Sequence, residues 1–91
     1  MKTKIVNSGV LNFDMKKIGK VLKCKRRGCD ITQDYMAFLT GRTKNHLSSV
    51  ERGIYEPSAI TLLIYMMVCG ISVDELLDKN ELKVLSSIRK E

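Results

Sequence analysis

Apolar residues recur every three or four positions along most of the chain, a spacing that places them on one face of a helix. Ser, Thr and Asp residues that cap helix starts, and glycines that end helices, divide this pattern into segments. The predicted helices cover residues 15–27, 33–40, 44–52, 59–69, 73–77 and 79–89. The sequence therefore predicts an all-α fold, with five helices followed by an extra C-terminal helix.

The first 13 residues follow a different pattern, in which apolar pairs flank a turn. Ile5-Val6 and Val10-Leu11 lie on either side of Asn7-Ser8-Gly9, and a turn between two apolar runs is typical of a small hairpin. We therefore expect three parts, which are an N-terminal arm at residues 1–13, a helical domain at residues 14–77 and a C-terminal helix at residues 78–91.

Length and composition exclude several classes of protein. The chain has 91 residues, 44% of them hydrophobic, which suits one small core and leaves little room for a multi-step enzyme. No apolar run reaches the roughly 18 residues of a membrane span, and the first residues lack the apolar region of a signal peptide. A Ser-His-Asp set, a phosphate-binding glycine loop and paired carboxylates are also absent from the sequence. We expect a cytoplasmic protein without enzymatic activity, cofactor or membrane contact.

The cysteines do not predict a metal site or a disulfide framework. Cys24, Cys29 and Cys69 are odd in number, and their spacing with His46 matches no common zinc pattern. We expect them to be free thiols that pack as small hydrophobic groups. Cys24 and Cys29 are candidates for sensing an oxidant, although the sequence does not indicate a lowered thiol pKa at either.

The net charge of +6 is unevenly distributed along the chain. Residues 1–55 contain twelve Lys or Arg and four Asp or Glu, whereas residues 56–91 contain four and six. A basic half opposite an acidic half suits a protein that lays one side on a polyanion. A solvated basic helix explains the same charge equally well, so charge alone does not decide for nucleic acid.

Two short helices joined at Gly41, over residues 33–40 and 44–52, have the arrangement of a helix-turn-helix. Around them the chain resembles the lambda-repressor-like family, of the Cro/repressor or xenobiotic-response-element type, over about residues 18–77 without insertion or deletion. The matching residues are Gln33-Asp34-Tyr35-Met36-Ala37, Gly41, Thr43, Leu47-Ser48, Val50-Glu51-Arg52-Gly53, Pro57-Ser58, Leu62-Leu63 and Gly70-Ile71-Ser72-Val73-Asp74-Glu75-Leu76-Leu77. The resemblance implies a five-helix DNA-binding domain, with Asp30 at a turn where the family usually has glycine.

The polar face of residues 44–52 is the predicted reading surface, because Leu47 and Val50 point to the opposite side of that helix. The resemblance assigns base contacts to Thr43, Lys44, Asn45 and Ser49, with Ser48 as a weaker candidate. Lysine can donate to guanine and asparagine can pair with adenine in the major groove.

Phosphate contacts and one structural ion pair complete the predicted site. The resemblance implies that Gln33 binds a DNA phosphate at a helix N-terminus, where free N–H groups favour anions. Further phosphate candidates are Arg42, Arg52, Tyr55, Lys16, Lys17 and Lys20. The resemblance also pairs Arg26 with a half-buried Glu51 across two helices.

The helix at residues 59–69 is apolar on two faces, so both must be covered. The predicted inner face is Ala59, Leu62, Leu63, Met66 and Cys69. Either a second subunit covers the other face, or the N-terminal arm and the last helix do; we favour a homodimer. The candidate interface residues are Ile60, Ile64, Met67, Val68, Leu76, Leu77, Leu82, Leu85 and Ile88.

Together these features predict a sequence-specific transcriptional regulator, a repressor that occupies a promoter. As a dimer it would read the two half-sites of an inverted repeat in double-stranded DNA. The alternative is a protein-interaction module, such as an antitoxin or the antagonist of a regulator, that binds a protein partner through the apolar surface of residues 59–69.

Overall fold

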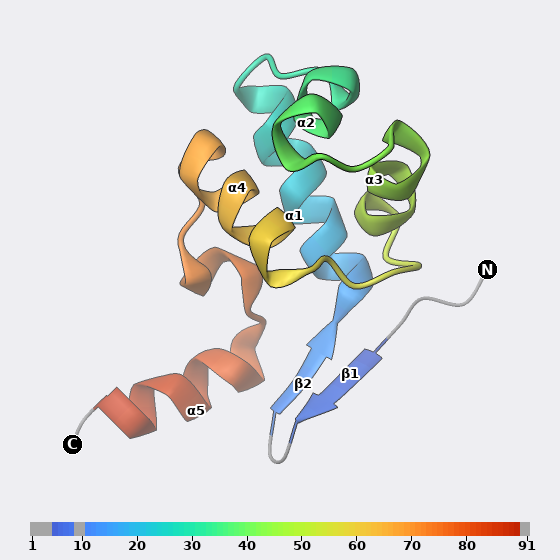
Figure 1. Cartoon of the computed structure of the whole chain (residues 1–91). Coiled ribbons are helices and arrows are strands. Elements are labelled where there is room, and N and C mark those ends of the chain that lie inside the picture. The colour runs from blue at the N-terminus through green and yellow to red at the C-terminus, as the bar shows by residue number, and fades with distance from the viewer. Residues whose placement is uncertain (1–4, 9–10, 90–91) are drawn as a thin grey trace.

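The computed structural model describes the backbone of residues 5–8 and 11–89 and the side chains of residues 13–88. Its elements are β1 (Ile5–Ser8), β2 (Leu11–Asp14), α1 (Met15–Gly28), α2 (Gln33–Thr40), α3 (Lys44–Glu51), α4 (Ala59–Cys69), the 3-10 helix η1 (Val73–Leu76) and α5 (Lys79–Arg89). Helices α1 to α4 form a bundle, and the hairpin and α5 extend from the same end of it (Figure 1). The predicted helical class, with an N-terminal hairpin and an extra C-terminal helix, is confirmed.

The hairpin has longer strands than the sequence predicts, because each strand contains four residues and β2 begins at Leu11 rather than at Val10. Strands β1 and β2 are antiparallel, with Ile5 opposite Asp14 and Ser8 opposite Leu11. Asn7 and Ser8 therefore belong to β1 rather than to the turn, and the connecting residues 9–10 lie outside the described residues. Pairing through Ser8 and Leu11 leaves a two-residue connection, the commonest length for a hairpin.

Side-chain caps set the starts of the helices at the positions that the sequence predicts. The hydroxyls of Thr32, Thr43 and Ser58 accept hydrogen bonds from the first turns of α2, α3 and α4, at 3.0, 3.0 and 3.2 Å. Asp14 does the same for α1 and also ends β2, so the hairpin runs into α1 without a linker. Asp30 has a φ of 58°, as expected where it replaces glycine, because aspartate tolerates this region better than most residues.

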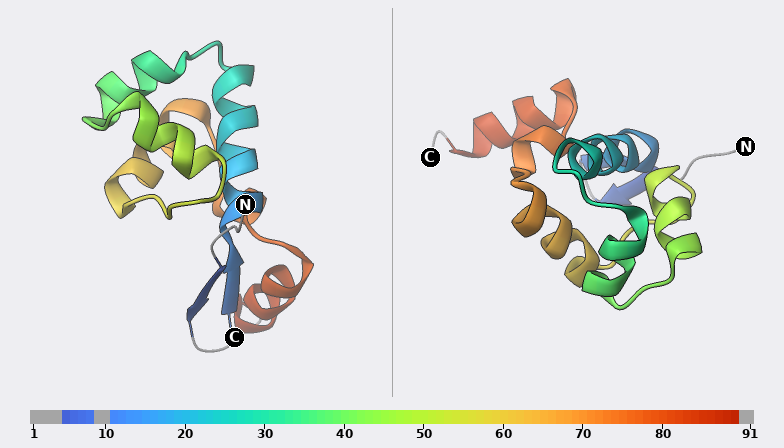
Figure 2. Two further views of the ribbon diagram at one scale, coloured as in Figure 1. Left: turned by 90° about the vertical axis from the view of Figure 1, so that its right-hand side faces the viewer. Right: turned by 90° about the horizontal axis from the view of Figure 1, so that it is seen from above.

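The core lies where α1, α2, α3 and α4 meet. Leu22, Met36, Leu47 and Tyr65 are fully buried there, one from each helix, and Val50 joins them from α3. The views in Figure 2 show α2 and α3 packed across α1 and α4. Each helix therefore gives its apolar face to a single shared core, which sets the position of α3.

The buried face of α4 differs from the predicted one. Cys69 is buried as predicted and Leu62 and Met66 are half-buried against the core. The predicted inner residues Ala59 and Leu63 are instead exposed, while Thr61 and Tyr65 are buried. The cause is the Tyr65 hydroxyl, which reaches a buried carboxylate and so turns its side of the helix inward. Ile64, predicted to lie in a dimer interface, is half-buried and packs against the core.

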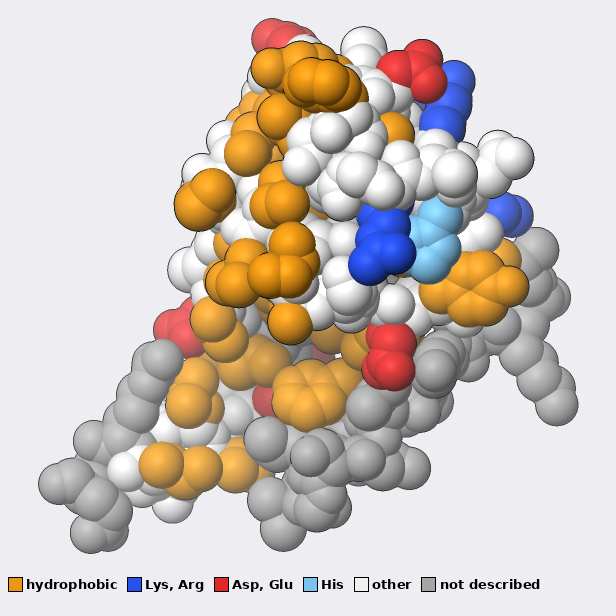
Figure 3. All heavy atoms as spheres, in the orientation of Figure 1, with side chains coloured by type: hydrophobic (Ala, Val, Ile, Leu, Met, Phe, Trp, Pro, Cys, Tyr) orange, Lys and Arg blue, Asp and Glu red, His pale blue; other side chains and the backbone are white. Residues whose placement is uncertain are grey.

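The outer face of α4 remains uncovered by the described part of the chain. Ile60 is 62% exposed and Met67 is 79% exposed. Figure 3 shows hydrophobic side chains in a continuous run over α2 and down along α4. On α2, Phe38 is 78% exposed and stacks on Tyr35 at a ring-centroid distance of 6.0 Å.

The hairpin and α5 lie beside each other below the bundle, as the left view of Figure 2 shows, and leave that face of α4 open. Lys17 of α1 holds the chain before α5, because its ammonium donates to the Leu77 carbonyl at 2.6 Å. Leu76, another predicted interface residue, is only 7% exposed and belongs to the protomer's own core. Leu82 and Ile88 are exposed on α5, and Leu77 and Leu85 are half-buried.

An ion pair connects α1 to η1. Lys25 Nζ lies 2.5 Å from Glu75 Oε1, and the Ser72 N–H donates to Glu75 Oε2 at 2.7 Å. Lys25 first, and then this N–H, lower the pKa of Glu75 to about 2. The unfolded state therefore binds the proton more readily, so the stability contributed by Glu75 is present above about pH 4.5 and is lost towards pH 2.

We expect a glutamine at position 75 to flatten the acid side of the stability profile, because Glu75→Gln removes a carboxylate that protonates mainly on unfolding. Thermal melts by circular dichroism between about pH 5 and pH 2 would measure this. The melting temperature of the wild type should fall more over this interval than that of Glu75→Gln. Parallel profiles for the two proteins would contradict the assignment.

Candidate nucleic-acid interface

Helix α3 lies at the edge of the bundle with its first turn in solvent (Figure 1). Thr43, Lys44 and Asn45 are exposed at this turn, while Leu47 and Val50 anchor the opposite side of the helix in the core. Ser48 and Ser49 are half-buried along the flank. The predicted base-reading residues are therefore brought together on one surface, with the three at the helix start most accessible.

The turn between α2 and α3 is held by its own hydrogen bonds. The Thr40 hydroxyl donates to the Met36 carbonyl at 2.9 Å, and the Arg42 N–H donates to the Ala37 carbonyl at 3.2 Å. Gly41 has a φ of 68°, which glycine adopts without the steric cost that a Cβ would bring. These contacts fix the direction in which α3 leaves the turn.

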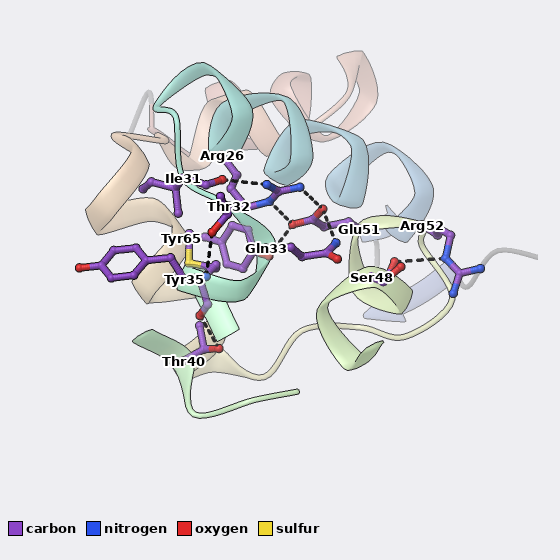
Figure 4. Close-up of polar contacts among 11 residues, drawn as sticks. Arg26, Ile31, Thr32, Gln33, Tyr35, Thr40, Ser48, Glu51, Arg52 and Tyr65 are labelled. Carbon is purple, nitrogen blue, oxygen red and sulfur yellow. Dashed lines mark hydrogen bonds and ion pairs between the residues drawn. The ribbon is translucent and has the colours of Figure 1, made fainter. Parts of the chain in front are cut away.

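A buried carboxylate connects all four helices of the bundle. Glu51 of α3 accepts two hydrogen bonds from Arg26 of α1, at 2.8 and 2.9 Å, and one from the Tyr65 hydroxyl of α4 at 2.6 Å. Gln33 of α2 donates to the same carboxylate at 3.1 Å. Figure 4 shows Glu51 between these three partners. The group is more enclosed than the half-buried pair that the sequence predicts, since Arg26 is 6% and Glu51 is 5% exposed.

The surroundings of Glu51 and Arg26 keep both side chains ionised. Burial acts to raise the pKa of Glu51, but the hydrogen bonds from Arg26 and Tyr65 outweigh it and hold that pKa below its usual value. Burial, together with the Glu51 charge, raises the pKa of Tyr65 well above its usual value, so the phenol remains a donor. The C-terminal end of α3 is therefore held by a carboxylate that stays charged.

Backbone contact also fixes α3 against α1. A Cβ built on Gly19 would lie 2.5 Å from the Val50 carbonyl oxygen and 2.6 Å from that of Glu51. A Cβ on Gly53, whose φ is 80°, would lie 2.5 Å from the Lys16 Cα. The close approach of α1 to α3 and to the loop after it therefore requires glycine at both position 19 and position 53. Sequence reasoning missed Gly19, although a glycine inside a helix is a signal of close packing.

The predicted phosphate contacts on α2 and α3 lie near the reading surface. The Gln33 amide is half-buried and bonds Glu51, with one N–H left beyond that bond. Arg42 is exposed in the turn. Arg52 is exposed after α3, where its Nε donates to the Ser48 carbonyl at 3.3 Å (Figure 4). These positions surround α3, as contacts to the flanking phosphates would require.

The three lysines of α1 differ in their surroundings. Lys16 and Lys20 are exposed, and Lys16 lies beside Gly53 in the loop that follows α3. Lys17 is half-buried and is already hydrogen-bonded to Leu77. Of the three, Lys16 is therefore the best placed to extend the basic surface around α3.

Two contacts at this surface were not predicted. His46 and Tyr55 stack with ring centroids 5.9 Å apart and an interplanar angle of 14°. Lys44 Nζ lies 3.6 Å from an Asp34 carboxylate oxygen, an exposed pair across the turn. Both join residues whose proximity depends on the angle between elements, which no local sequence pattern reports.

The described residues show neither a metal cluster nor a membrane helix. No three His, Cys, Asp or Glu side chains gather in a way that could hold a metal ion within this part of the chain. None of its helices is both long enough and apolar enough to span a bilayer.

Comparison with known proteins gives a match over the same bundle. A helix-turn-helix family model matches residues 22–76, from the middle of α1 to the end of η1. The ImmF control region 10 kDa protein of Bacillus phage phi105 is 40% identical over 50 residues, which cover 55% of this chain and 56% of that protein. The chain thus matches only about half the length of this curated relative.

A solved structure is also similar. The restriction-modification controller protein C.AhdI from Aeromonas hydrophila aligns with a TM-score of 0.60 and 30% sequence identity, covering 70% of this chain and 97% of its own. Nearly the whole of that protein therefore corresponds to part of this chain.

Proposed function

We propose that this chain, which belongs to the lambda-repressor-like helix-turn-helix family, reads a specific sequence in the major groove of double-stranded DNA through α3. The family consists of DNA-binding regulators rather than enzymes, and the proposal assigns this chain no reaction. The observation that carries it is the exposed polar first turn of α3, held by a rigid bundle behind it. By occupying a promoter the protein would repress transcription.

Base contacts come from the start of α3. Lys44 can donate to guanine O6 or N7, and the Asn45 amide can pair with adenine N6 and N7. Thr43 precedes them at the cap, and Ser48 and Ser49 follow along the flank, where their short side chains reach less far. Lys44 would exchange its exposed contact with Asp34 for a base, since such surface pairs contribute little.

Phosphate contacts orient α3 without reading sequence. Gln33 at the start of α2 would donate its free amide N–H to a phosphate beside the open N-terminus of the helix. Arg42, Arg52 and Tyr55 are exposed around α3, and Lys16 of α1 lies beside the loop that follows it. Lys20 is also exposed on α1 and would contact a phosphate further from α3. Lys17 would have to leave the Leu77 carbonyl, so we rank it last.

Equilibrium titration with random and selected duplexes, at several salt concentrations, tests the proposal. We expect the selected duplex to bind at least about 1,000-fold more tightly than random DNA at physiological salt. Affinity for both should decrease as salt rises, because phosphate contacts release counterions. Equal affinity for selected and random duplexes would overturn the proposal of sequence-specific reading.

A homodimer would place two copies of α3 on half-sites about 34 Å apart along an inverted repeat. The predicted interface residues that remain accessible are Ile60, Met67, Val68, Leu82 and Ile88. They form two groups, one on α4 and one on α5. The α4 group is larger, with three of these exposed residues against two on α5.

We expect Met67→Asp to shift the protein from dimer to monomer, since a charge in the centre of the α4 face would oppose its burial. Sedimentation velocity at micromolar concentration measures the change. Ile88→Asp, on α5, is the matched variant and should sediment like the wild type if α4 forms the interface. A wild type that stays monomeric at these concentrations would contradict the dimer.

The same apolar face supports a second candidate function. A surface with Ile60, Met67 and Phe38 exposed together fits a protein-interaction module, such as an antitoxin or the antagonist of a regulator. In that case the α4 face would bind another protein rather than a second copy. A monomeric wild type that lacks sequence preference in the DNA titration would favour this candidate.

A further inference from the structure

Two cysteines from distant parts of the chain meet at one end of the bundle. Cys29 is the residue that caps the end of α1, and Cys69 is the last residue of α4. We propose that Cys29 and Cys69 are an oxidation site, at which hydrogen peroxide produces an intramolecular disulfide that ties α1 to α4. This inference goes beyond the proposed reading of DNA and does not depend on it.

The contact between the two residues is direct. The Cys29 thiol donates to the Cys69 carbonyl oxygen at a sulfur–oxygen distance of 3.7 Å. Burial first, and then the neighbouring Cys29 thiol, raise the pKa of the Cys69 thiol to about 11. Both observations place the Cys29 sulfur next to Cys69, although 40 positions separate the two residues in sequence.

The two thiols differ in access, which assigns their roles. Cys29 is exposed, so it meets an oxidant from solvent, whereas Cys69 is only 8% exposed. A cysteine that is accessible and lies beside a second thiol is the arrangement in which the first oxidation product is resolved as a disulfide. Cys29 is therefore the attacking residue, and Cys69 is the resolving residue.

The chemistry balances with peroxide as the oxidant. The Cys29 thiolate attacks one peroxide oxygen, the O–O bond breaks, and the released hydroxide takes up a proton as water, which leaves a sulfenic acid on Cys29. The Cys69 sulfur then attacks the Cys29 sulfur, the S–O bond breaks, and the departing hydroxide takes the Cys69 proton. Two thiols thereby lose two electrons, and one peroxide becomes two waters.

The disulfide would close a loop that contains the whole helix-turn-helix. Helices α2 and α3 both lie between Cys29 and Cys69, so the bond restricts the unfolded chain over about 40 residues. The bridge would also sit beside Tyr65, which is one turn before Cys69 and bonds Glu51. We therefore expect oxidation to stabilise the bundle.

The third cysteine supplies the control. Cys24 is exposed on α1 and borders a groove with Lys20, Val21, Lys25 and Glu75. A Cys24→Ser protein keeps the proposed pair and removes any disulfide between molecules through Cys24. The matched protein carries Cys24→Ser and Cys29→Ser, which changes only an exposed thiol and so retains the fold.

The test is treatment of both proteins with stoichiometric hydrogen peroxide, followed by alkylation under denaturing conditions and peptide mass spectrometry. For Cys24→Ser we expect a Cys29–Cys69 linked peptide, reversal by dithiothreitol, and a melting temperature raised by about 10 °C or more. The protein that also lacks Cys29 should show neither change. Sulfinic acid at Cys29 with Cys69 still alkylated, or a linked peptide without a rise in melting temperature, would overturn the proposal.

Discussion

Replacing Glu51 by glutamine should lower the free energy of unfolding by about 3–5 kcal/mol, because the buried Arg26 guanidinium would lose its charged partner. The amide could still accept from Tyr65 or Arg26, but it carries no charge to offset the desolvation of Arg26. Such a loss is a large part of the stability of a small domain. Urea unfolding followed by circular dichroism at pH 7 measures it.

The control for Glu51→Gln is Asp34→Asn, the same chemical change at an exposed carboxylate. The Asp34 side chain is 75% exposed and lies 3.6 Å from Lys44 Nζ. Asp34→Asn should therefore lower the free energy of unfolding by less than about 1 kcal/mol. The double variant Arg26→Met/Glu51→Met should lose less unfolding free energy than the two single variants lose together, because it leaves no unpaired buried charge. A change below about 1 kcal/mol for Glu51→Gln would contradict this role for the network.

Replacing Gly19 by alanine should destabilise the protein by about 1–3 kcal/mol, although alanine favours helices elsewhere. The added methyl would lie 2.5 Å from the Val50 carbonyl oxygen, and neither helix can yield without moving backbone. Displacement of α3 should also reduce affinity for the selected duplex, even in the molecules that remain folded. Unfolding and duplex titration together measure both effects.

Gly28→Ala is the matched control, because a Cβ at Gly28 would meet no atom within 4 Å. The same substitution near the end of the same helix should leave stability unchanged or raise it by up to about 1 kcal/mol. If Gly19→Ala behaved like Gly28→Ala, the close approach of α1 and α3 would not determine the position of α3.

The helix boundaries could be predicted from sequence because they depend on local chemistry. Thr32, Thr43 and Ser58 each supply an oxygen to the N–H three residues later, whatever the rest of the chain does. The positive φ of Asp30 follows from the turn that it occupies. Features that a few neighbouring residues decide were thus accessible without a structure.

The rotation of α4 could not be predicted in the same way, because apolar residues surround that helix and leave no single hydrophobic face. The buried side is chosen instead by Tyr65, whose hydroxyl needs a buried partner that comes from α3. Ile64 therefore packs against the protomer's own core instead of a dimer interface. Leu76 is buried for a different tertiary reason, because η1 packs against α1. The meeting of Cys29 with Cys69 likewise depends on how α1 and α4 end side by side.

The candidate reading surface was predicted largely through resemblance to the family, and the structure adds what holds it in place. Lys44 and Asn45 are exposed as the helical pattern requires. The hydrogen bond from Gln33 to Glu51 was not foreseen, and it links a predicted phosphate contact to the buried network. A phosphate bound to Gln33 would therefore lie next to the Glu51 network, which positions α3.

The most direct measurement is the base preference of Asn45→Ala, obtained by selection from a random duplex library beside the wild type. We predict that the variant loses preference at one base pair in each half-site, with discrimination reduced there by about 1–3 kcal/mol. Asn80→Ala removes an exposed asparagine on α5 and should select the wild-type sequence. If Asn45→Ala also selected the wild-type sequence with unchanged affinity, α3 would not be the element that reads DNA.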